Sequence, residues 1–482
     1  MVVSKIFKNK VIQYVLSRYF TYFIQFINSL FIAVYLGPFY LGIWGFINLV
    51  LQYFTQINFG IPYSVNVIVS TKKDDKAYVE QVFQNSIFLT SVLSFLALAC
   101  LFFLNYFDLN LGAKYNFNEY LPLVALIIIG NYFIPLLSNV LRIYGKIGEI
   151  AFAQSILPLS MLAVSFFFKG PQLVYALIYA QIFSIVATLA LFIYKLDLKF
   201  RLTFNWKVSK YIQRRGLLLF IYNSSFYLII ISTRSIISYF YNVSEFGMFT
   251  FAFTLGNTVN LLLSSLSFLI FPKVLYKLSK TTNEEGISFL NKIRHSYIYT
   301  SHFFIYILIF VFPVFLYFFP KYNEALDAFR LIGLTIVLYS NTFGYQGLLL
   351  AKEKDKLIAT ISASMLVLNV VLGFVFAKYF ALDYSLIILA TTVTYFTYIF
   401  LLGYFGRKLL EQPVNFYSLL NDVFPIKLLA PFLLVTSMVI LKTPSLMYIF
   451  PVILFVAINY KSIAEIKKTI RQIIDNPKII NI

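Results

Sequence analysis

The sequence predicts an all-α polytopic membrane protein, and three observations lead to this class. Of its 482 residues, 60% are hydrophobic and only 12% are charged, whereas soluble domains are about 45–50% apolar and about 25% charged. Apolar runs long enough for a helix across a hydrocarbon core about 30 Å thick alternate with short polar hinges. These runs are too continuous for the alternating strands of a membrane barrel, so helices are expected.

The charge-free runs predict fourteen transmembrane helices. Arg18 is the one charged residue between Lys10 and Lys72, and the turn Gly37-Pro38 divides that stretch into two spans. We expect the spans at about 11–36, 42–70, 81–107, 120–141, 150–168, 172–194, 216–241, 246–272, 296–320, 328–351, 357–377, 384–406, 424–441 and 444–460.

The loops between these spans predict the orientation of the chain. Alternate loops, counted from the N-terminus, hold 31 Lys and Arg residues, whereas the opposite set holds 5. Such an excess marks the cytoplasmic side, so both termini are expected there. Topology therefore explains the net charge of +20 without a nucleic-acid partner. The single cysteine, Cys100, lies in an apolar run and offers no metal site, and no cofactor is expected.

The two halves of the chain repeat at a nearly constant offset. Residues 40–46 align with 245–251, and Asn118-Glu119 aligns with Asn323-Glu324, both at an offset of 205. Residues 144–149 align with 350–355 at an offset of 206. Because six helices per unit is an even number, both units have one orientation, which makes a parallel repeat. Two such lobes around a central site suit alternating access.

The repeat and the loops predict the domain organisation. We expect an N-terminal lobe at 1–194, a cytoplasmic amphipathic linker at 195–215, a C-terminal lobe at 216–410, a helix pair at 411–460 and a cytoplasmic amphipathic tail at 461–482.

Several short motifs resemble the MOP exporter superfamily, and within it the polysaccharide-synthesis branch of O-antigen and capsule flippases. They are Tyr35-Leu36-Gly37-Pro38 continuing to Gly42-Ile43-Trp44, then Gly60-Ile61-Pro62 and Ser244-Glu245-Phe246-Gly247. The resemblance covers about residues 5–410 and implies a MATE-like fold in a bacterial inner membrane. It also implies transfer of undecaprenyl-diphosphate-linked oligosaccharides to the outer leaflet, with a polysaccharide polymerase and a chain-length regulator as expected partners. The extra helix pair departs from a twelve-span plan and occurs in lipid II flippases.

Three arginines inside the predicted spans are the first candidates for substrate binding. Arg18 lies in span 1, Arg234 deep in span 7 and Arg330 at the outer start of span 10. A charge in a membrane span is costly and usually faces water or a partner. Guanidinium suits a diphosphate because its planar fork bonds phosphate oxygens bidentately. The alternative for Arg18 and Arg234 is a structural contact to helix carbonyls or a snorkelled head group, and for Arg330 it is snorkelling to the outer interface.

Amide side chains inside the spans are the second set of candidates. They include Asn28, Asn66 and Asn223, together with Gln52, and they could bond either sugar hydroxyls or neighbouring helices. No Asp or Glu lies near the middle of a predicted span, which disfavours the alternative of a multidrug or metabolite antiporter. A membrane enzyme is disfavoured because the loops are short and no catalytic or nucleotide-binding motif occurs, so a non-enzymatic flippase is the expected function.

Overall fold

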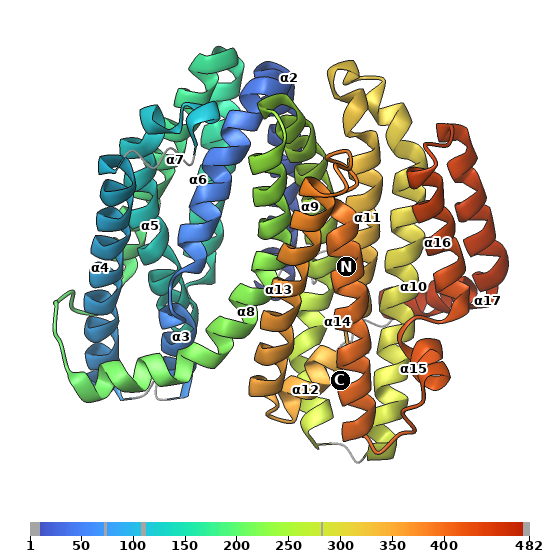
Figure 1. Ribbon diagram of the computed structural model, residues 1–482. Coiled ribbons are helices and arrows are strands. Elements are labelled where there is room, and N and C mark those ends of the chain that lie inside the picture. Colours follow the sequence, from blue (N-terminus) through green and yellow to red (C-terminus); the bar gives the residue numbers. More distant parts are fainter. Residues whose placement is uncertain (1–9, 72–74, 108–111, 281–282, 476–482) are drawn as a thin grey trace. The chain divides into compact units, whose positions relative to one another are not determined.

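The computed structural model describes residues 10–71, 75–107, 112–280 and 283–475, and for some of these, including 10–19, 262–280 and 465–475, the backbone alone. The described chain is helical throughout (Figure 1). The elements are α2 (Lys10–Gln56), α3 (Ile61–Thr71), α4 (Lys76–Tyr106), η1 (Ala113–Tyr115), α5 (Phe117–Ile143), α6 (Ile147–Phe167), α7 (Gly170–Lys195), α8 (Trp206–Phe240), α9 (Val243–Lys280), α10 (Asn283–Leu316), η2 (Pro320–Ala325), α11 (Leu326–Asn341), α12 (Tyr345–Ala351), α13 (Asp355–Lys378), α14 (Ile388–Leu409), α15 (Phe416–Val423), α16 (Ile426–Ile440), η3 (Ser445–Tyr448) and α17 (Ile449–Asp475).

The predicted all-α membrane class is confirmed, whereas the count of fourteen spans is not. Among the described residues, ten helices are long and apolar enough to cross a membrane, or eleven if the bent pair α15 and α16 forms one span. Every predicted span overlaps a helix, but α2 joins two predicted spans in 47 residues and α11 has only 16 residues. The number of spans counted from long helices in the described residues is therefore lower than the fourteen predicted from the sequence.

Helix breaks explain much of this difference. Gly37 has a φ of 65° inside α2, which a residue without a side chain adopts readily, and the next residue is Pro38. The predicted span 42–70 is interrupted at residues 57–60, where the Asn58 side chain accepts a hydrogen bond from the Gly60 amide at 2.9 Å. The predicted span 328–351 is divided between α11 and α12 at Gly344, whose φ is 97°.

The chain forms two compact units, Met1–Thr250 and Phe251–Ile482. Within unit 1, α5, α6 and α7 pack together, and α2 contacts these three helices and α8. Within unit 2, α11 packs on α10 and α14, while α17 packs on α10 and α16. The lobe boundaries expected from the sequence remain predictions.

The internal repeat has a matching aromatic contact in each unit. In unit 1 the rings of Phe46 and Tyr115 stack with centroids 4.2 Å apart, and in unit 2 those of Phe251 and Tyr322 stack at 4.1 Å. The first residues of the two pairs are 205 positions apart, as the sequence alignment predicts. In both units the stack joins a long helix to the short 3-10 helix before the next span.

The turns before α6 and α13 also match. The amide of Lys146 donates to the carbonyl of Leu141 at 3.0 Å, and that of Lys354 donates to the carbonyl of Leu349 at 2.9 Å. The central residues, Gly145 and Glu353, both have positive φ. The structural offset at this turn is therefore 208, two more than the sequence alignment predicts.

Two segments related by the repeat meet in a reciprocal contact inside unit 1. A Cβ atom on Gly42 would overlap the carbonyl oxygen of Val243, and one on Gly247 would overlap the carbonyl oxygen of Pro38. Val243 and Gly247 are the repeat equivalents of Pro38 and Gly42 at the offset of 205. Two copies related by a two-fold axis make contacts of this kind, in which each partner uses the same surface. Small residues let the two helix backbones approach closely.

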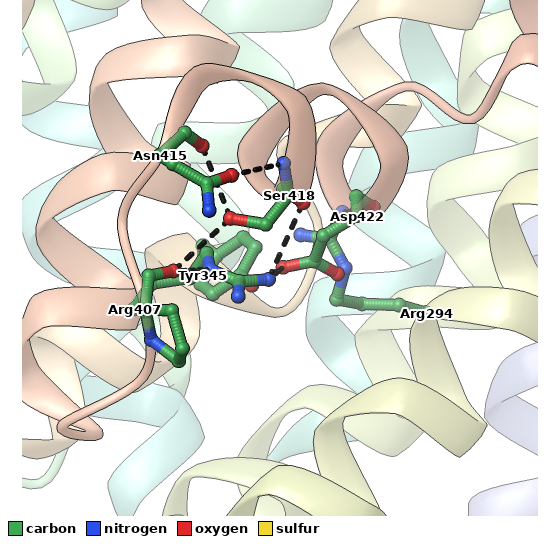
Figure 2. A network of polar contacts seen from close by, with 7 residues as sticks. Arg294, Tyr345, Arg407, Asn415, Ser418 and Asp422 are labelled. Carbon is green, nitrogen blue, oxygen red and sulfur yellow. Dashed lines mark hydrogen bonds and ion pairs between the residues drawn. The ribbon is translucent and has the colours of Figure 1, made fainter.

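A short helix fastens the C-terminal helices within unit 2 (Figure 2). Asp422 of α15 forms an ion pair with Arg407 of α14 at 3.1 Å and accepts a hydrogen bond from the Tyr345 hydroxyl of α12. Its backbone carbonyl accepts from Arg294 of α10 at 3.3 Å, and the Arg294 guanidinium lies 4.2 Å from the Tyr345 ring centre. Asp422 thus joins α15, and the helix pair that follows it, to three other helices, two through its carboxylate and one through its backbone carbonyl.

We expect Gly42→Ala and Gly247→Ala each to lower the stability of the protein by about 1–3 kcal/mol, because the new methyl group meets backbone that cannot move aside. Thermal melting of the purified protein in detergent measures this loss. Gly148→Ala in α6 is the matched control, since nothing lies within 4 Å of the added carbon. Equal melting temperatures for the three variants would contradict the close contact.

Candidate binding site around Arg234

Arg234 is carried by α8, and both ends of this helix are fixed by polar contacts. At the start, the Asn205 side chain accepts hydrogen bonds from two amides of the first turn. Near the end, the Lys114 ammonium donates to the carbonyls of Tyr239 and Tyr241 at 3.2 and 2.6 Å. A cation at a helix C-terminus is favourable because it complements the helix dipole. Partial burial lowers the pKa of Lys114 below its usual value.

The Arg234 side chain is almost completely buried, with 2% of its surface exposed. Nη1 donates to the side-chain oxygen of Gln52 at 2.6 Å, and Nη2 donates to the backbone carbonyl of Gly45 at 3.2 Å. The guanidinium carbon lies 6.0 Å from the centre of the Phe246 ring. These three partners are neutral groups that solvate the guanidinium. Hydrogen bonds to a charged group are worth about 1.5–3 kcal/mol each.

Other polar side chains lie on the same surfaces as these contacts. Asn223, Tyr227 and Arg234 follow one another at intervals of four and seven residues, which places them on one face of α8. Tyr227 is 38% exposed, and Asn223 is half-buried. From α2, the Tyr53 hydroxyl lies 2.7 Å from that of Ser235.

We call Arg234, Gln52, Tyr53 and Tyr227 the Arg234 cluster, and Asn223 lies on the same face of α8 about three turns before Arg234. The outer members of the cluster are partly exposed and its charged member is buried. The cluster can therefore offer hydroxyl and amide groups to a bound molecule, backed by a fixed positive charge.

Arg330 has a different environment in unit 2. It donates to the Asp327 carboxylate at 3.1 Å and to the Ser445 hydroxyl at 3.0 Å, and its guanidinium lies 3.6 Å from the Tyr448 ring centre. Its exposed fraction is 2%. Arg330 therefore joins α11 to η3, and these contacts differ from the snorkelling that was the alternative prediction.

The remaining predicted site residues are dispersed. Asn28 is buried in α2, and its side-chain oxygen has no hydrogen-bond partner among the described residues. Asn66 of α3 accepts a hydrogen bond from Arg142 at 2.9 Å. Arg18 lies in the helical part of α2 of which only the backbone is described, so its side-chain contacts lie outside the described structure.

The sequence analysis had already noted some of the residues in and around the Arg234 cluster. Gln52 belongs to the amides noted inside the spans, and Gly45 and Phe246 lie in or beside the family-like motifs. Their contact with Arg234 was not predictable, because 182 residues separate Gln52 from Arg234.

Solved structures of membrane transporters resemble the chain over most of its length. The lipid II flippase MurJ, in an inward closed conformation, matches with a TM-score of 0.71 at 13% identity, covering 95% of this chain and 99% of that chain. An inward-facing multidrug resistance MATE family transporter of the MOP superfamily matches with a TM-score of 0.65 at 15% identity, covering 81% and 94%. A MOP superfamily transporter from Pyrococcus furiosus, described as having a binding pocket of reverse polarity, matches with a TM-score of 0.52 at 15% identity, covering 83% and 95%.

These likenesses show that the chain has the fold that these transporters share, and its apolar helices are those of a multi-pass membrane protein. Residues 146–287 also match the sequence model of a family described as polysaccharide biosynthesis protein. No curated protein matches the sequence. The predicted resemblance to the MOP exporter superfamily, and to its polysaccharide-synthesis branch, is confirmed.

We expect Arg330→Gln to destabilise unit 2 by about 2–3 kcal/mol, because it leaves Asp327 without its buried cation. Ser445→Ala removes only a neutral partner of the same guanidinium and should cost about 1 kcal/mol. Thermal melting in detergent compares the two variants. A smaller loss for Arg330→Gln than for Ser445→Ala would contradict a structural role of this arginine.

Proposed function

We propose that this protein is a flippase that moves undecaprenyl-diphosphate-linked oligosaccharides from the cytoplasmic to the outer leaflet, for assembly of a surface polysaccharide. The observation that carries the proposal is a MOP-type transporter fold in a chain that also matches a polysaccharide biosynthesis family. The excess of Lys and Arg in alternate loops supports cytoplasmic termini in a bacterial inner membrane. A polymerase and a chain-length regulator would then act on the product.

The Arg234 cluster supports an anionic substrate. Its guanidinium bonds a side-chain amide and a backbone carbonyl and lies near an aromatic ring, and Arg234 is deep within a predicted span. In a medium of low dielectric constant, such a charge acts over a longer range than it does in water. We infer that it attracts the diphosphate of the lipid carrier, while the amide and hydroxyl groups of the cluster meet the sugar.

A lipid II flippase is the second candidate for this chain. The match to MurJ extends over 95% of the chain, which includes most of the C-terminal helix pair that departs from the twelve-span plan. Both candidates share a polyprenyl diphosphate carrier, and they differ in the attached sugar. A drug antiporter is less well supported, because no carboxylate lies near the middle of a predicted span.

Leaflet-resolved detection of lipid-linked sugars in cells lacking the protein tests the function. We expect the undecaprenyl-diphosphate-linked oligosaccharide to accumulate in the cytoplasmic leaflet. Accumulation in the outer leaflet would assign the protein to a later step of assembly. Accumulation of lipid II alone would favour the second candidate.

Substitutions at Gln52 test the role of the Arg234 charge. Gln52→Glu has nearly the same shape and sets a carboxylate against the guanidinium, so we expect it to reduce transport at least about ten-fold. Gln52→Met removes the hydrogen bond and leaves the charge, so its effect should be smaller. Transport in cells, normalised to the amount of folded protein in the membrane, distinguishes the two.

Arginine variants complete this test. Arg234→Gln should abolish transport, and Arg234→Lys should retain a part of it because the charge remains while the fork is lost. If both single variants, Arg234→Gln and Gln52→Glu, transport at the full rate, the cluster has no role in transport. The leaflet measurement would still test the flippase function independently.

A further inference from the structure

Arg142, at the end of α5, is held in place by two amide side chains. Its Nη2 donates to the side-chain oxygen of Asn66 at 2.9 Å and to that of Asn139 at 3.1 Å. Asn66 lies on α3, so the guanidinium is fixed by two different helices. Asn66 was predicted as a substrate-binding residue, and this contact gives it a defined geometry.

The orientation of Asn139 is itself fixed. Its amide nitrogen donates to the backbone carbonyl of Pro62 at 2.9 Å, which turns its side-chain oxygen toward Arg142. The chain of contacts from Pro62 through Asn139 to Arg142 limits the freedom of a side chain that is otherwise long and flexible. Such ordering in advance reduces the entropy lost when a ligand binds.

The remaining donors of Arg142 are available. The residue is exposed, and within the part of the chain that the structure describes it forms no ion pair. Both amide contacts are made by Nη2, and no contact of Nη1 or Nε is found among the described residues. A charged N–H donor of this kind forms a short, strong hydrogen bond with a phosphate oxygen.

The other unit builds the same turn without these polar residues. Gly145 corresponds to Glu353 in the matched turns before α6 and α13, so Arg142 corresponds to Leu350 and Asn139 to Gly347. Unit 2 therefore forms this turn without polar side chains at these two positions, so the fold alone does not demand Arg142 and Asn139 in unit 1.

We propose that Arg142, positioned by Asn66 and Asn139, binds a lipid phosphate at the cytoplasmic membrane surface. The position of Arg142 in the membrane follows from the predicted topology, in which α5 ends at the cytoplasmic side. The phosphates of lipid head groups lie at this surface. The phosphate can belong to the diphosphate of a lipid-linked sugar or to a membrane phospholipid. In the first case the site receives the substrate of the proposed flippase before translocation.

Binding to the purified full-length protein in a phosphate-free maltoside detergent tests the site. Native mass spectrometry can measure the affinities for undecaprenyl diphosphate, for phosphatidylglycerol and for the uncharged undecaprenol. We expect Arg142→Gln to weaken binding of at least one phosphate-bearing lipid about ten-fold, and Arg142→Lys to weaken it less. Asn139→Leu should weaken it about three-fold, because Arg142 loses one of its supports.

Arg201→Gln is the matched control, because Arg201 is an exposed arginine of unit 1 with no such amide contacts. It should change the affinities less than two-fold, and no variant should change binding of undecaprenol. Equal effects of Arg142→Gln and Arg201→Gln, or an equal loss of undecaprenol binding, would overturn the proposal. If Arg142→Gln does not fold, Arg142→Lys and Asn139→Leu test the proposal instead. Unchanged binding of phosphate-bearing lipids by both of these variants would also overturn the proposal.

The choice of lipid identifies the source of the phosphate. A loss specific to undecaprenyl diphosphate assigns the site to the lipid-linked sugar, and a loss specific to phosphatidylglycerol assigns it to membrane phospholipid. Both results support a phosphate site. Because the measurement involves no translocation, its failure would leave the flippase proposal to the leaflet experiment.

Discussion

The close crossing of residues 38–45 with residues 243–250 is the contact on which the rest of unit 1 depends. Gly42 and Gly247 bring two helix backbones within a distance that no side chain would permit. Gly45 lies on the same segment, and its carbonyl accepts a hydrogen bond from Arg234. One residue further, Phe46 stacks on Tyr115, whose hydroxyl bonds the backbone of α8 at Ser238. The crossing therefore sets the position of α8, and with it the depth of the buried charge.

In lipid, polar groups must find partners inside the protein, and the two units satisfy this requirement differently. Unit 1 gathers an arginine, amides and hydroxyls between α2 and α8. Unit 2 surrounds His302 with Asn341 and Tyr306 close to the break between α11 and α12, and joins its C-terminal helices through Asp422. The repeated scaffold is thus filled with different polar contacts in its two units.

The helical class, the division of the chain at Gly37 and the offset of 205 followed from apolar runs and short alignments, because each is a local pattern. The break at Gly344 was not predicted, since a lone glycine in an apolar run does not reveal its φ angle. The hydrogen bonds from Arg234 to Gln52 and from Arg330 to Ser445 could not be found either, because more than 100 residues separate the two members of each pair in the sequence. Arg142 was assigned to a loop, and only the structure brings Asn66 and Asn139 to it.

The reciprocal glycine contact also bears on the origin of the chain. A surface that meets its own repeat equivalent is self-complementary, so two separate copies of one six-helix polypeptide could form the same contact as a homodimer. Fusion of two such genes would preserve the interface and release the two halves to diverge. Arg142 and Asn139, whose counterparts are Leu350 and Gly347, are a difference between the halves that a fused chain can acquire and an identical pair of polypeptides cannot.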